Sequence, residues 1–238
     1  DQPGMTCTVC DSKTTSPILL SQGDVYLNVD FGYMPATGYG ATIGDKVWLD
    51  ADADGTQITG EPGIAGVSVA LIQDLDGDGK WDAGEPIIAT TITDDLGAYT
   101  FDGVAVGGDY LVWVNDTDHV LGTLTPTYDD DGTHTPSISA VTDLTAAGDL
   151  TQDFGYAPED QKTNTGLIGD TIFLDRDNDD VADAGEGLEG VKVYLDSDND
   201  GMWDTGEPYT VTDENGHYYF AGLADGTYVV RVDMTTLP

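Results

Sequence analysis

The chain contains 238 residues, of which 45 are acidic and seven are basic, and its formal net charge at pH 7 is −38. Such a negative chain repels nucleic acid and anionic membrane surfaces, which excludes both as partners. Hydrophobic residues make up 39% of the sequence, with 12 tyrosines and four tryptophans among them, so a packed core is expected.

No apolar run approaches the roughly 20 residues that a membrane-spanning helix needs, and no signal peptide is expected within this sequence. Membrane insertion within this segment is therefore not expected. The sequence begins at Asp1, so we expect a processed product or a segment of a longer protein.

An acidic stretch at residues 74–85 has the spacing of a twelve-residue calcium loop. Carboxylates occupy loop positions 1, 3, 5, 9 and 12, and a glycine occupies position 6; the carboxylates belong to Asp74, Asp76, Asp78, Asp82 and Glu85. Calcium is a hard cation that takes about six to eight oxygen ligands, and alternate residues of such a loop can converge on it. The stretch is therefore predicted to bind calcium.

Three further stretches repeat this pattern, at residues 50–61, 175–186 and 196–207. The stretch at 175–186 has Asp180 at position 6 in place of glycine, so weaker binding or altered geometry is expected there. Four matches in one chain favour bound calcium over chance. The candidate ligands in these three stretches are Asp50, Asp52, Asp54 and Glu61, then Asp175, Asp177, Asp179 and Glu186, then Asp196, Asp198, Asp200, Asp204 and Glu207.

Two strings recur along the chain and indicate tandem domains. The string at residues 43–50 returns at residues 168–175, and the Asp-Phe-Gly-Tyr string at residues 30–33 returns at residues 153–156. Both intervals are about 125 residues, an ordinary size for one domain. The predicted divisions are the C-terminal strands of one domain in residues 1–36, a complete domain in residues 37–160, and the N-terminal two-thirds of another in residues 161–238.

The partial domains at the two ends complement each other, because residues 161–238 followed by residues 1–36 read as one uninterrupted domain. Two arrangements fit this observation. Either the chain continues as a longer repetitive protein, or residues 1–36 of one subunit complete the C-terminal domain of the next by strand addition. Both give a linear polymer, and both cover strand edges that would otherwise favour aggregation.

The pattern between the acidic stretches is that of β-structure. Short runs of β-branched and aromatic residues alternate with Gly, Pro and Asp clusters, most clearly at residues 67–72, 87–92, 98–101 and 110–114. No apolar stripe with a helical period accompanies the acidic stretches, which disfavours helical calcium-binding folds. The pattern predicts an all-β chain of sandwich domains, joined by short linkers near residues 35–42 and 158–166 that bring neighbouring domains into contact.

The acidic loops, the strings at residues 43–50, 63–67 and 93–101 with their second copies, and the closing Asp-Phe-Gly-Tyr occur together. In this combination, over nearly the whole chain, the sequence resembles the SdrD B-like, Cna B-type calcium-binding repeats of bacterial and archaeal surface proteins, including the serine-aspartate repeat adhesins. The resemblance implies tandem transthyretin-like, inverse immunoglobulin-type sandwiches, rigidified by calcium, that serve as a stalk or spacer. It also implies that Asp94 and Asp213 are further calcium ligands near the first loop of each copy.

Three smaller features carry predictions of their own. Cys7 and Cys10 are the only cysteines, so we predict a local or interchain disulfide outside the cell, with free thiols as the alternative. Asn115 begins an Asn-Asp-Thr glycosylation sequon. The acidic string at residues 127–131 either holds another calcium ion or forms a solvated loop.

No serine-histidine-aspartate order, phosphate loop or nucleotide fingerprint occurs, so no enzyme is predicted. The features instead predict a calcium-stabilised extracellular structural repeat protein at the cell surface, which forms a filament, stalk or surface layer by self-association or continuation of the chain. The main alternative is an adhesin module that binds a host protein or glycan, and an accessory domain of a secreted enzyme is a third option. Calcium is expected to keep the fold rigid and not to act as a switch.

Overall fold

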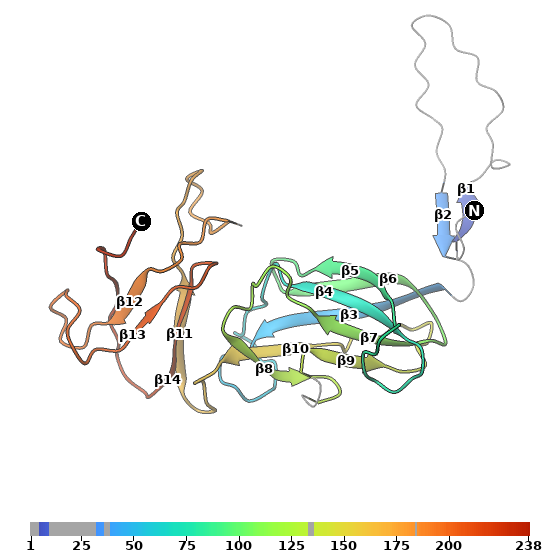
Figure 1. Ribbon diagram of the computed structural model, residues 1–238, viewed down its shortest axis with the longest axis horizontal. Coiled ribbons are helices and arrows are strands. Elements are labelled where there is room, and N and C mark those ends of the chain that lie inside the picture. The colour runs from blue at the N-terminus through green and yellow to red at the C-terminus, as the bar shows by residue number, and fades with distance from the viewer. Residues whose placement is uncertain (1–4, 10–31, 36–38, 133–135, 184) are drawn as a thin grey trace, which may run out of the picture.

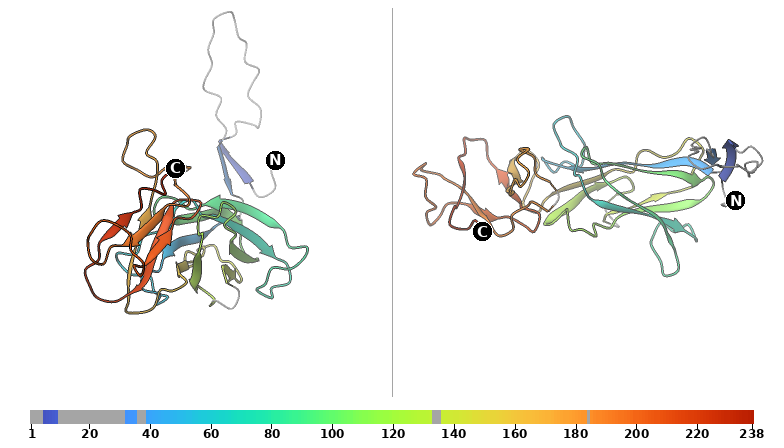
Figure 2. Two further views of the ribbon diagram at one scale, coloured as in Figure 1. Left: turned by 60° about the vertical axis from the view of Figure 1, so that its left-hand side comes forward. Right: turned by 90° about the horizontal axis from the view of Figure 1, so that it is seen from above.

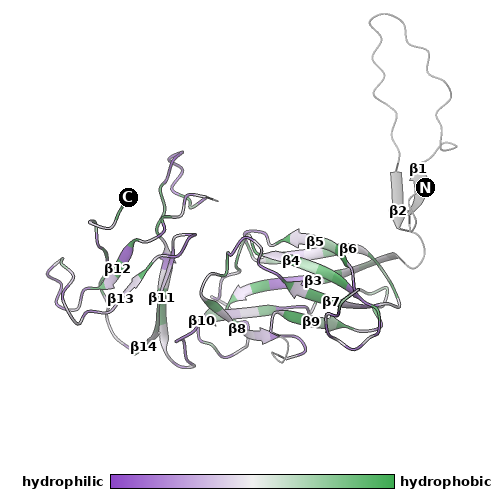
Figure 3. Ribbon diagram, in the orientation of Figure 1, coloured by the Kyte–Doolittle hydropathy of each residue, from purple (hydrophilic) through white to green (hydrophobic). Residues whose placement is uncertain are grey.

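The computed structural model describes residues 5–9, 32–35, 39–132, 136–183 and 185–238, and these ranges contain fifteen β-strands and no helix. The prediction of an all-β chain is confirmed. Two sandwich-like units, residues 39–158 and 166–232, follow one another along the long axis (Figures 1 and 2). Polar residues gather in the loops and apolar residues along the strands (Figure 3). No helix in the described ranges is long and apolar enough to cross a membrane.

The first unit is a complete sandwich of two four-stranded sheets, with the strand orders β6-β3-β10-β8 and β5-β4-β7-β9. Strand β10 runs parallel to β3, with Phe154 opposite Val47, so the end of the unit returns beside its first strand. The strands are β3 (Tyr39–Leu49), β4 (Ser68–Asp74), β5 (Ile87–Ile92), β6 (Ala98–Ala105), β7 (Asp109–Val114), β8 (Leu124–Asp129), β9 (Ile138–Val141) and β10 (Phe154–Pro158).

Alternation along the strands explains this packing. Val69 and Leu71 lie two residues apart on β4, and Leu71 is paired with Val112 on β7. All three side chains point into the space between the sheets. Ile43 on β3 and Phe154 on β10 close the same core from the opposite sheet. Burial of these side chains holds the two sheets together and fixes where their end loops lie.

The second unit repeats the first five strands of the complete one. Sheet β11-β14 corresponds to β3-β6, and sheet β13-β12-β15 corresponds to β5-β4-β7. Its core is smaller and is built around Val193, Leu195 and Phe220. In the described part of the chain, no strand pairs with the second edge of β11 or of β15. The strands are β11 (Gly166–Thr171), β12 (Lys192–Leu195), β13 (Tyr209–Val211), β14 (His217–Leu223) and β15 (Val230–Val232).

An N-terminal hairpin pairs β1 (Met5–Val9) with β2 (Gly32–Pro35). Its register is that of β8 and β10 in the complete unit, including an irregularity at the same step. The hairpin is therefore the backbone counterpart of that strand pair. In the hairpin the pairs are Met5 with Pro35, Thr6 with Met34, Cys7 with Tyr33 and Val9 with Gly32. In the same order, the pairs of β8 and β10 are Leu124 with Pro158, Thr125 with Ala157, Pro126 with Tyr156 and Tyr128 with Gly155.

The linker between the two units is tied to both of them. The Gln161 side chain is only 7% exposed, and its Nε2 donates to the carbonyl oxygen of Ala51 (2.7 Å). Its Oε1 accepts a hydrogen bond from the amide of Gly222 (2.9 Å). A direct contact joins the units as well, because Asn215 Nδ2 donates to the carbonyl oxygen of His119 (2.9 Å). The predicted contact between neighbouring units is thus confirmed.

Candidate metal centres

Four acidic loops connect the strands. Loop 1 (residues 50–61) joins β3 to β4, loop 2 (74–85) joins β4 to β5, loop 3 (175–186) joins β11 to β12, and loop 4 (196–207) joins β12 to β13. In loops 1, 2 and 4 the aspartate at position 1 ends a strand or directly follows one, and packing against the core excludes water from it. Asp50, Asp74 and Asp196 are 0%, 6% and 3% exposed.

The glutamate at position 12 closes every loop in the same way. One of its carboxylate oxygens accepts a hydrogen bond from the amide at position 2, and the other accepts one from the amide at position 9. For Glu85 these donors are Leu75 (2.8 Å) and Asp82 (2.9 Å). The same contacts join Glu61 to Ala51 and Ile58, Glu186 to Arg176 and Asp183, and Glu207 to Ser197 and Asp204.

The aspartate at position 1 accepts hydrogen bonds from the backbone turn that follows it. Asp50 receives the amides of Asp54 (3.1 Å) and Gly55 (2.9 Å). The corresponding donors are Gly77 and Gly79 for Asp74, Asn178, Asp179 and Asp180 for Asp175, and Asp200 and Gly201 for Asp196. These amides fix the carboxylate at the centre of the turn.

The turn needs a left-handed backbone at positions 4 and 6. At position 6, φ is 73° at Gly55, 74° at Gly79, 65° at Asp180 and 85° at Gly201. Asp180 therefore adopts the conformation of the glycines, although an L-residue is strained there. Altered geometry of this turn is not observed in loop 3, and weaker binding stays a prediction.

Carboxylate oxygens converge within the loops. In loop 1, oxygens of Asp50, Asp52 and Glu61 lie within 4.8 Å of one another, and one oxygen of Asp52 is buried without a hydrogen-bond donor. A buried oxygen with no donor, in a set made only of oxygens, is the arrangement that a calcium ligand requires. The residues present thus fit this ion. Further groups include Asp74, Asp76 and Glu85; Asp76, Asp78 and Asp82; Asp175, Asp177 and Asp179; and Asp196, Asp198 and Glu207.

Asp94 and Asp213 lie in the turns that precede β6 and β14. Asp94 Oδ1 accepts hydrogen bonds from the amides of Leu96 and Ala98, both 2.9 Å. Asp213 Oδ1 makes the same contacts with Asn215 and His217, both 2.9 Å. Both carboxylates hold these turns in shape, and their role as calcium ligands stays a prediction.

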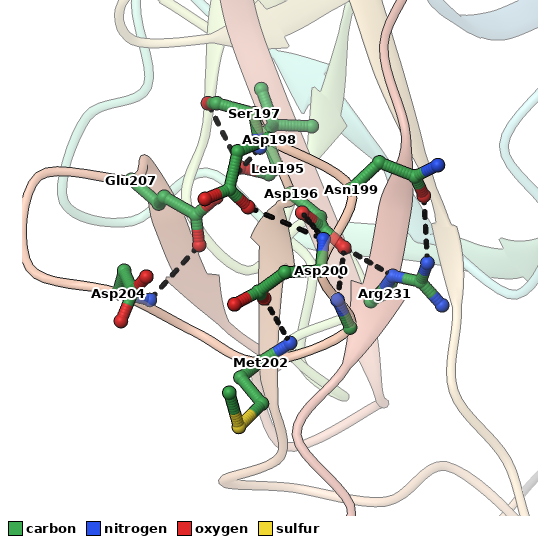
Figure 4. Close-up of polar contacts among 11 residues, drawn as sticks. Leu195, Asp196, Ser197, Asp198, Asn199, Asp200, Met202, Asp204, Glu207 and Arg231 are labelled. Carbon is green, nitrogen blue, oxygen red and sulfur yellow. Dashed lines mark hydrogen bonds and ion pairs between the residues drawn. The ribbon is translucent and has the colours of Figure 1, made fainter.

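Loops 2 and 4 differ in the side chain that reaches them from the neighbouring strand. Trp81 of loop 2 packs on Trp113 of β7, with ring centroids 4.6 Å apart. The residue in the place of Trp113 on β15 is Arg231, whose Nε lies 2.5 Å from Asp196 Oδ2 (Figure 4). Its Nη2 donates to Asn199 Oδ1 (2.8 Å). Loop 4 thus carries an internal cation on its first carboxylate.

Electrostatics reflect these differences. Burial raises the pKa of Asp196, but the hydrogen bonds from Arg231 and the Gly201 amide outweigh it, so this pKa lies below its usual value. In loop 3, the charge of the neighbouring Asp179 is the main cause that raises the pKa of Asp183. The four loops share a backbone and differ in charge balance.

Sequence reasoning missed three of these residues. Asp183 holds position 9 of loop 3, where its amide donates to Glu186, and the spacing that identified Asp82 would have found it. Arg231 and Gln161 carry no local signal, because their contacts depend on strand pairing and on the junction between units.

Two further predictions are not decided by the structure. Cys10 lies outside the described residues and only the backbone of Cys7 is described, so the disulfide stays a prediction. Asn115 follows β7 and is partly buried, and its amide donates to the carbonyl oxygen of Ser68 (3.2 Å). Glycosylation at Asn115 stays a prediction.

Tandem β-sandwich units with oxygen-rich loops at the strand ends define a class of structural repeat module. The SdrD B-like domain model matches residues 41–167 and 166–237, and the chain belongs to this family. The family assignment that the sequence motifs suggested is confirmed. This membership makes the chain part of a cell-surface, extracellular protein built of structural repeats.

Two similar relatives come from staphylococci. The serine-aspartate repeat-containing protein F of Staphylococcus epidermidis is 32% identical over 224 residues, which cover 92% of this chain and 12% of the relative. The bone sialoprotein-binding protein of Staphylococcus aureus (strain MRSA252) is also 32% identical over 224 residues, covering 92% of this chain and 18% of the relative. The chain therefore spans less than a fifth of the length of these relatives.

One similar solved structure is the D295N mutant of the shaft pilin SpaA from Lactobacillus rhamnosus GG. Its TM-score is 0.36 and its sequence identity is 15%, with 84% of this chain and 89% of the pilin chain covered.

Proposed function

We propose that this segment is a calcium-stabilised, non-enzymatic stalk or filament repeat. The observation that carries the proposal is the shared construction of the four loops, in which the position-12 glutamate bonds to the amides at positions 2 and 9. A loop braced in this way keeps its carboxylates together despite their repulsion. Bound calcium would supply the positive charge that these carboxylates lack.

The mechanism is thermodynamic and mechanical. An ion that binds only the folded state adds RT ln(1 + [Ca]/Kd), about 2.7 kcal/mol per site at a hundredfold excess. Calcium loops of extracellular modules typically bind at about 0.1 to 1 mM, so such sites fill outside a cell and stay empty inside it. The strands that carry the loops run straight into the core, so each filled loop would stiffen its unit.

Melting temperature in calcium and in excess EGTA tests this proposal, with magnesium at the same concentration as the control. We expect a large increase in calcium and a smaller one in magnesium, because magnesium demands a regular octahedral site and gives up its water reluctantly. A melting temperature that is the same in calcium and in EGTA would overturn the calcium mechanism.

The register match between the hairpin β1–β2 and the pair β8–β10 supports the proposed linear assembly. A strand pair of this register would complete a unit like the second one beside β11, as β10 and β8 do beside β3. Continuation of the chain and addition from another subunit both remain open. Hydrogen exchange of β11 at rising protein concentration separates the two arrangements. Only addition between subunits gives protection of β11 that increases with concentration, and light scattering should then show a growing particle mass.

The alternative, recognition of a host protein or glycan, has one structural observation in its favour. A cleft of about 1050 Å³ lies between the units and is lined by acidic side chains that include Asp95, Asp118, Asp170 and Glu214. Such a cleft would favour a basic ligand. Binding of basic peptides that is lost when Asp118 and Glu214 are neutralised would support this alternative over a purely structural role.

A further inference from the structure

Asp129 ends strand β8 and is only 2% exposed, yet neither of its carboxylate oxygens has a hydrogen-bond partner. The buried carboxylates of Asp50, Asp74 and Asp196 instead each accept backbone amides. An unpaired carboxylate away from water is costly, so such a group requires a proton or a cation.

The surroundings of Asp129 supply no positive charge. In the described part of the chain no ion pair reaches it, since these pairs are Lys80 with Asp78, His217 with Asp213 and Arg231 with Asp196. Its neighbours Asp130 and Asp131 are acidic. Burial, then the charge of Asp131, raises the pKa of Asp129, as expected for a buried carboxylate beside another acid.

The backbone around Asp129 is fixed, so the two nearby carboxylates are held in place. Asp129 is paired with Phe154 in the sheet, and its carbonyl oxygen accepts the amide of Gly132 (3.2 Å). One oxygen of Asp131 accepts the amide of Ala140 on β9 (3.1 Å), which ties the turn to the opposite sheet. The hydroxyl of Thr127, two residues earlier on β8, is a further buried oxygen without a partner.

We propose that Asp129 and Asp131 bind a hard divalent cation, with calcium the species of choice outside a cell, at the end of β8. This site goes beyond the proposed function because it uses none of the four loops. It corresponds to the first of the two interpretations of the acidic string at residues 127–131, a further calcium site. In the hairpin β1–β2, Val9 is the counterpart of Tyr128, so the sequence has Cys10 in the place of Asp129. The site therefore belongs to the complete unit.

Equilibrium dialysis of the full chain against calcium, with metal analysis, tests the site through Asp129→Asn. This variant keeps the shape of the side chain and removes its charge. We expect it to bind one calcium ion fewer than the original chain. In EGTA it should melt at a higher temperature than the original chain, because an unpaired charge is gone, and calcium should narrow or reverse this difference.

Glu159→Gln is the matched control, since Glu159 is an exposed carboxylate that directly follows β10 of the same unit and should leave stoichiometry and melting unchanged. Asp131→Asn, at an exposed position, gives a second test if Asp129→Asn fails to fold, and it should also lose one ion. Unchanged stoichiometry in the folded variant, with equal stabilisation in calcium and in EGTA, would overturn the site. This result is distinct from failure of the loops, which would leave one ion bound to the original chain.

Discussion

Arg231 lies on the carboxylate of Asp196, with Nε 2.5 Å from Oδ2, and so places a guanidinium on the first residue of loop 4. In loop 2 the corresponding aspartate is Asp74, and the matching strand position holds Trp113, an uncharged side chain. The same twelve-residue pattern thus occurs with and without a cation on its first carboxylate, since Lys80 of loop 2 lies 3.5 Å from the exposed Asp78 instead. Since a cation at the first ligand repels calcium, loop 4 should depend on the metal less than loop 2 does.

Replacing Arg231 with methionine should reverse this difference. The variant keeps an apolar stem and removes the charge, so calcium affinity of loop 4 should rise by about tenfold, the equivalent of one charge-assisted hydrogen bond. Without calcium the second unit should become less stable, because Asp196 loses its partner. Calorimetric titration of the full chain and melting in EGTA measure the two effects.

Arg176→Met provides the control for that experiment. Arg176 sits at position 2 of loop 3, but its Nη1 donates to the carbonyl oxygen of Gly185 (2.9 Å). Its removal should leave the affinity of loop 4 unchanged. If Arg231→Met leaves both affinity and metal-free stability unaltered, the ion pair does not regulate the loop.

Local pattern predicted the strands and the loop positions, because alternation and ligand spacing are both short-range features of sequence. Asp74, Asp76 and Glu85 converge as their spacing implies. The contact between Arg231 and Asp196 spans 35 positions and depends on the pairing of β12 with β15, which no local string encodes. The buried, unpartnered state of Asp129 likewise depends on how the two sheets meet.

The conformation of Asp180 leads to a second prediction. Its φ of 65° is strained for an L-residue, so Asp180→Gly should stabilise the second unit by about 0.5–1 kcal/mol in urea unfolding. Asp180→Asn removes the charge without changing the backbone cost, and it separates the two effects. The reciprocal change, Gly201→Asp at φ 85°, should destabilise the same unit. Equal stability of Asp180→Gly and Asp180→Asn would contradict the strain argument.

Gln161 leads to a third prediction, on coupling between the units. Gln161→Leu removes the hydrogen bonds of this buried side chain to Ala51 and Gly222. A hydrogen bond of this kind contributes about 0.5–1.5 kcal/mol, so the junction should loosen. Small-angle scattering should then show a wider range of distances between the units. Lys162→Ala, at the exposed neighbouring position, is the control, and an unchanged scattering profile for Gln161→Leu would show that the glutamine does not hold the junction.

The last prediction concerns pH. Burial, then the charge of Asp45, raises the pKa of Asp153 to about 6 from 3.8. Between these two values the folded state holds a proton that the unfolded state has released, so this group's contribution to stability falls as pH rises from about 4 to about 6.

Asp153→Asn isolates that contribution, because the amide oxygen can still accept the Lys46 amide, which lies 3.1 Å from Asp153 Oδ1. The measurement is made in EGTA to keep metal out. As pH rises over this window, the free energy of unfolding of the variant should fall by on the order of 1 kcal/mol less than that of the original chain, after allowance for solvent screening. Urea unfolding at pH 4.5, inside that window, and at pH 7, above it, provides the measurement. Parallel losses in the two proteins would mean that Asp153 titrates normally, and that general repulsion among the 45 acidic residues accounts for the slope.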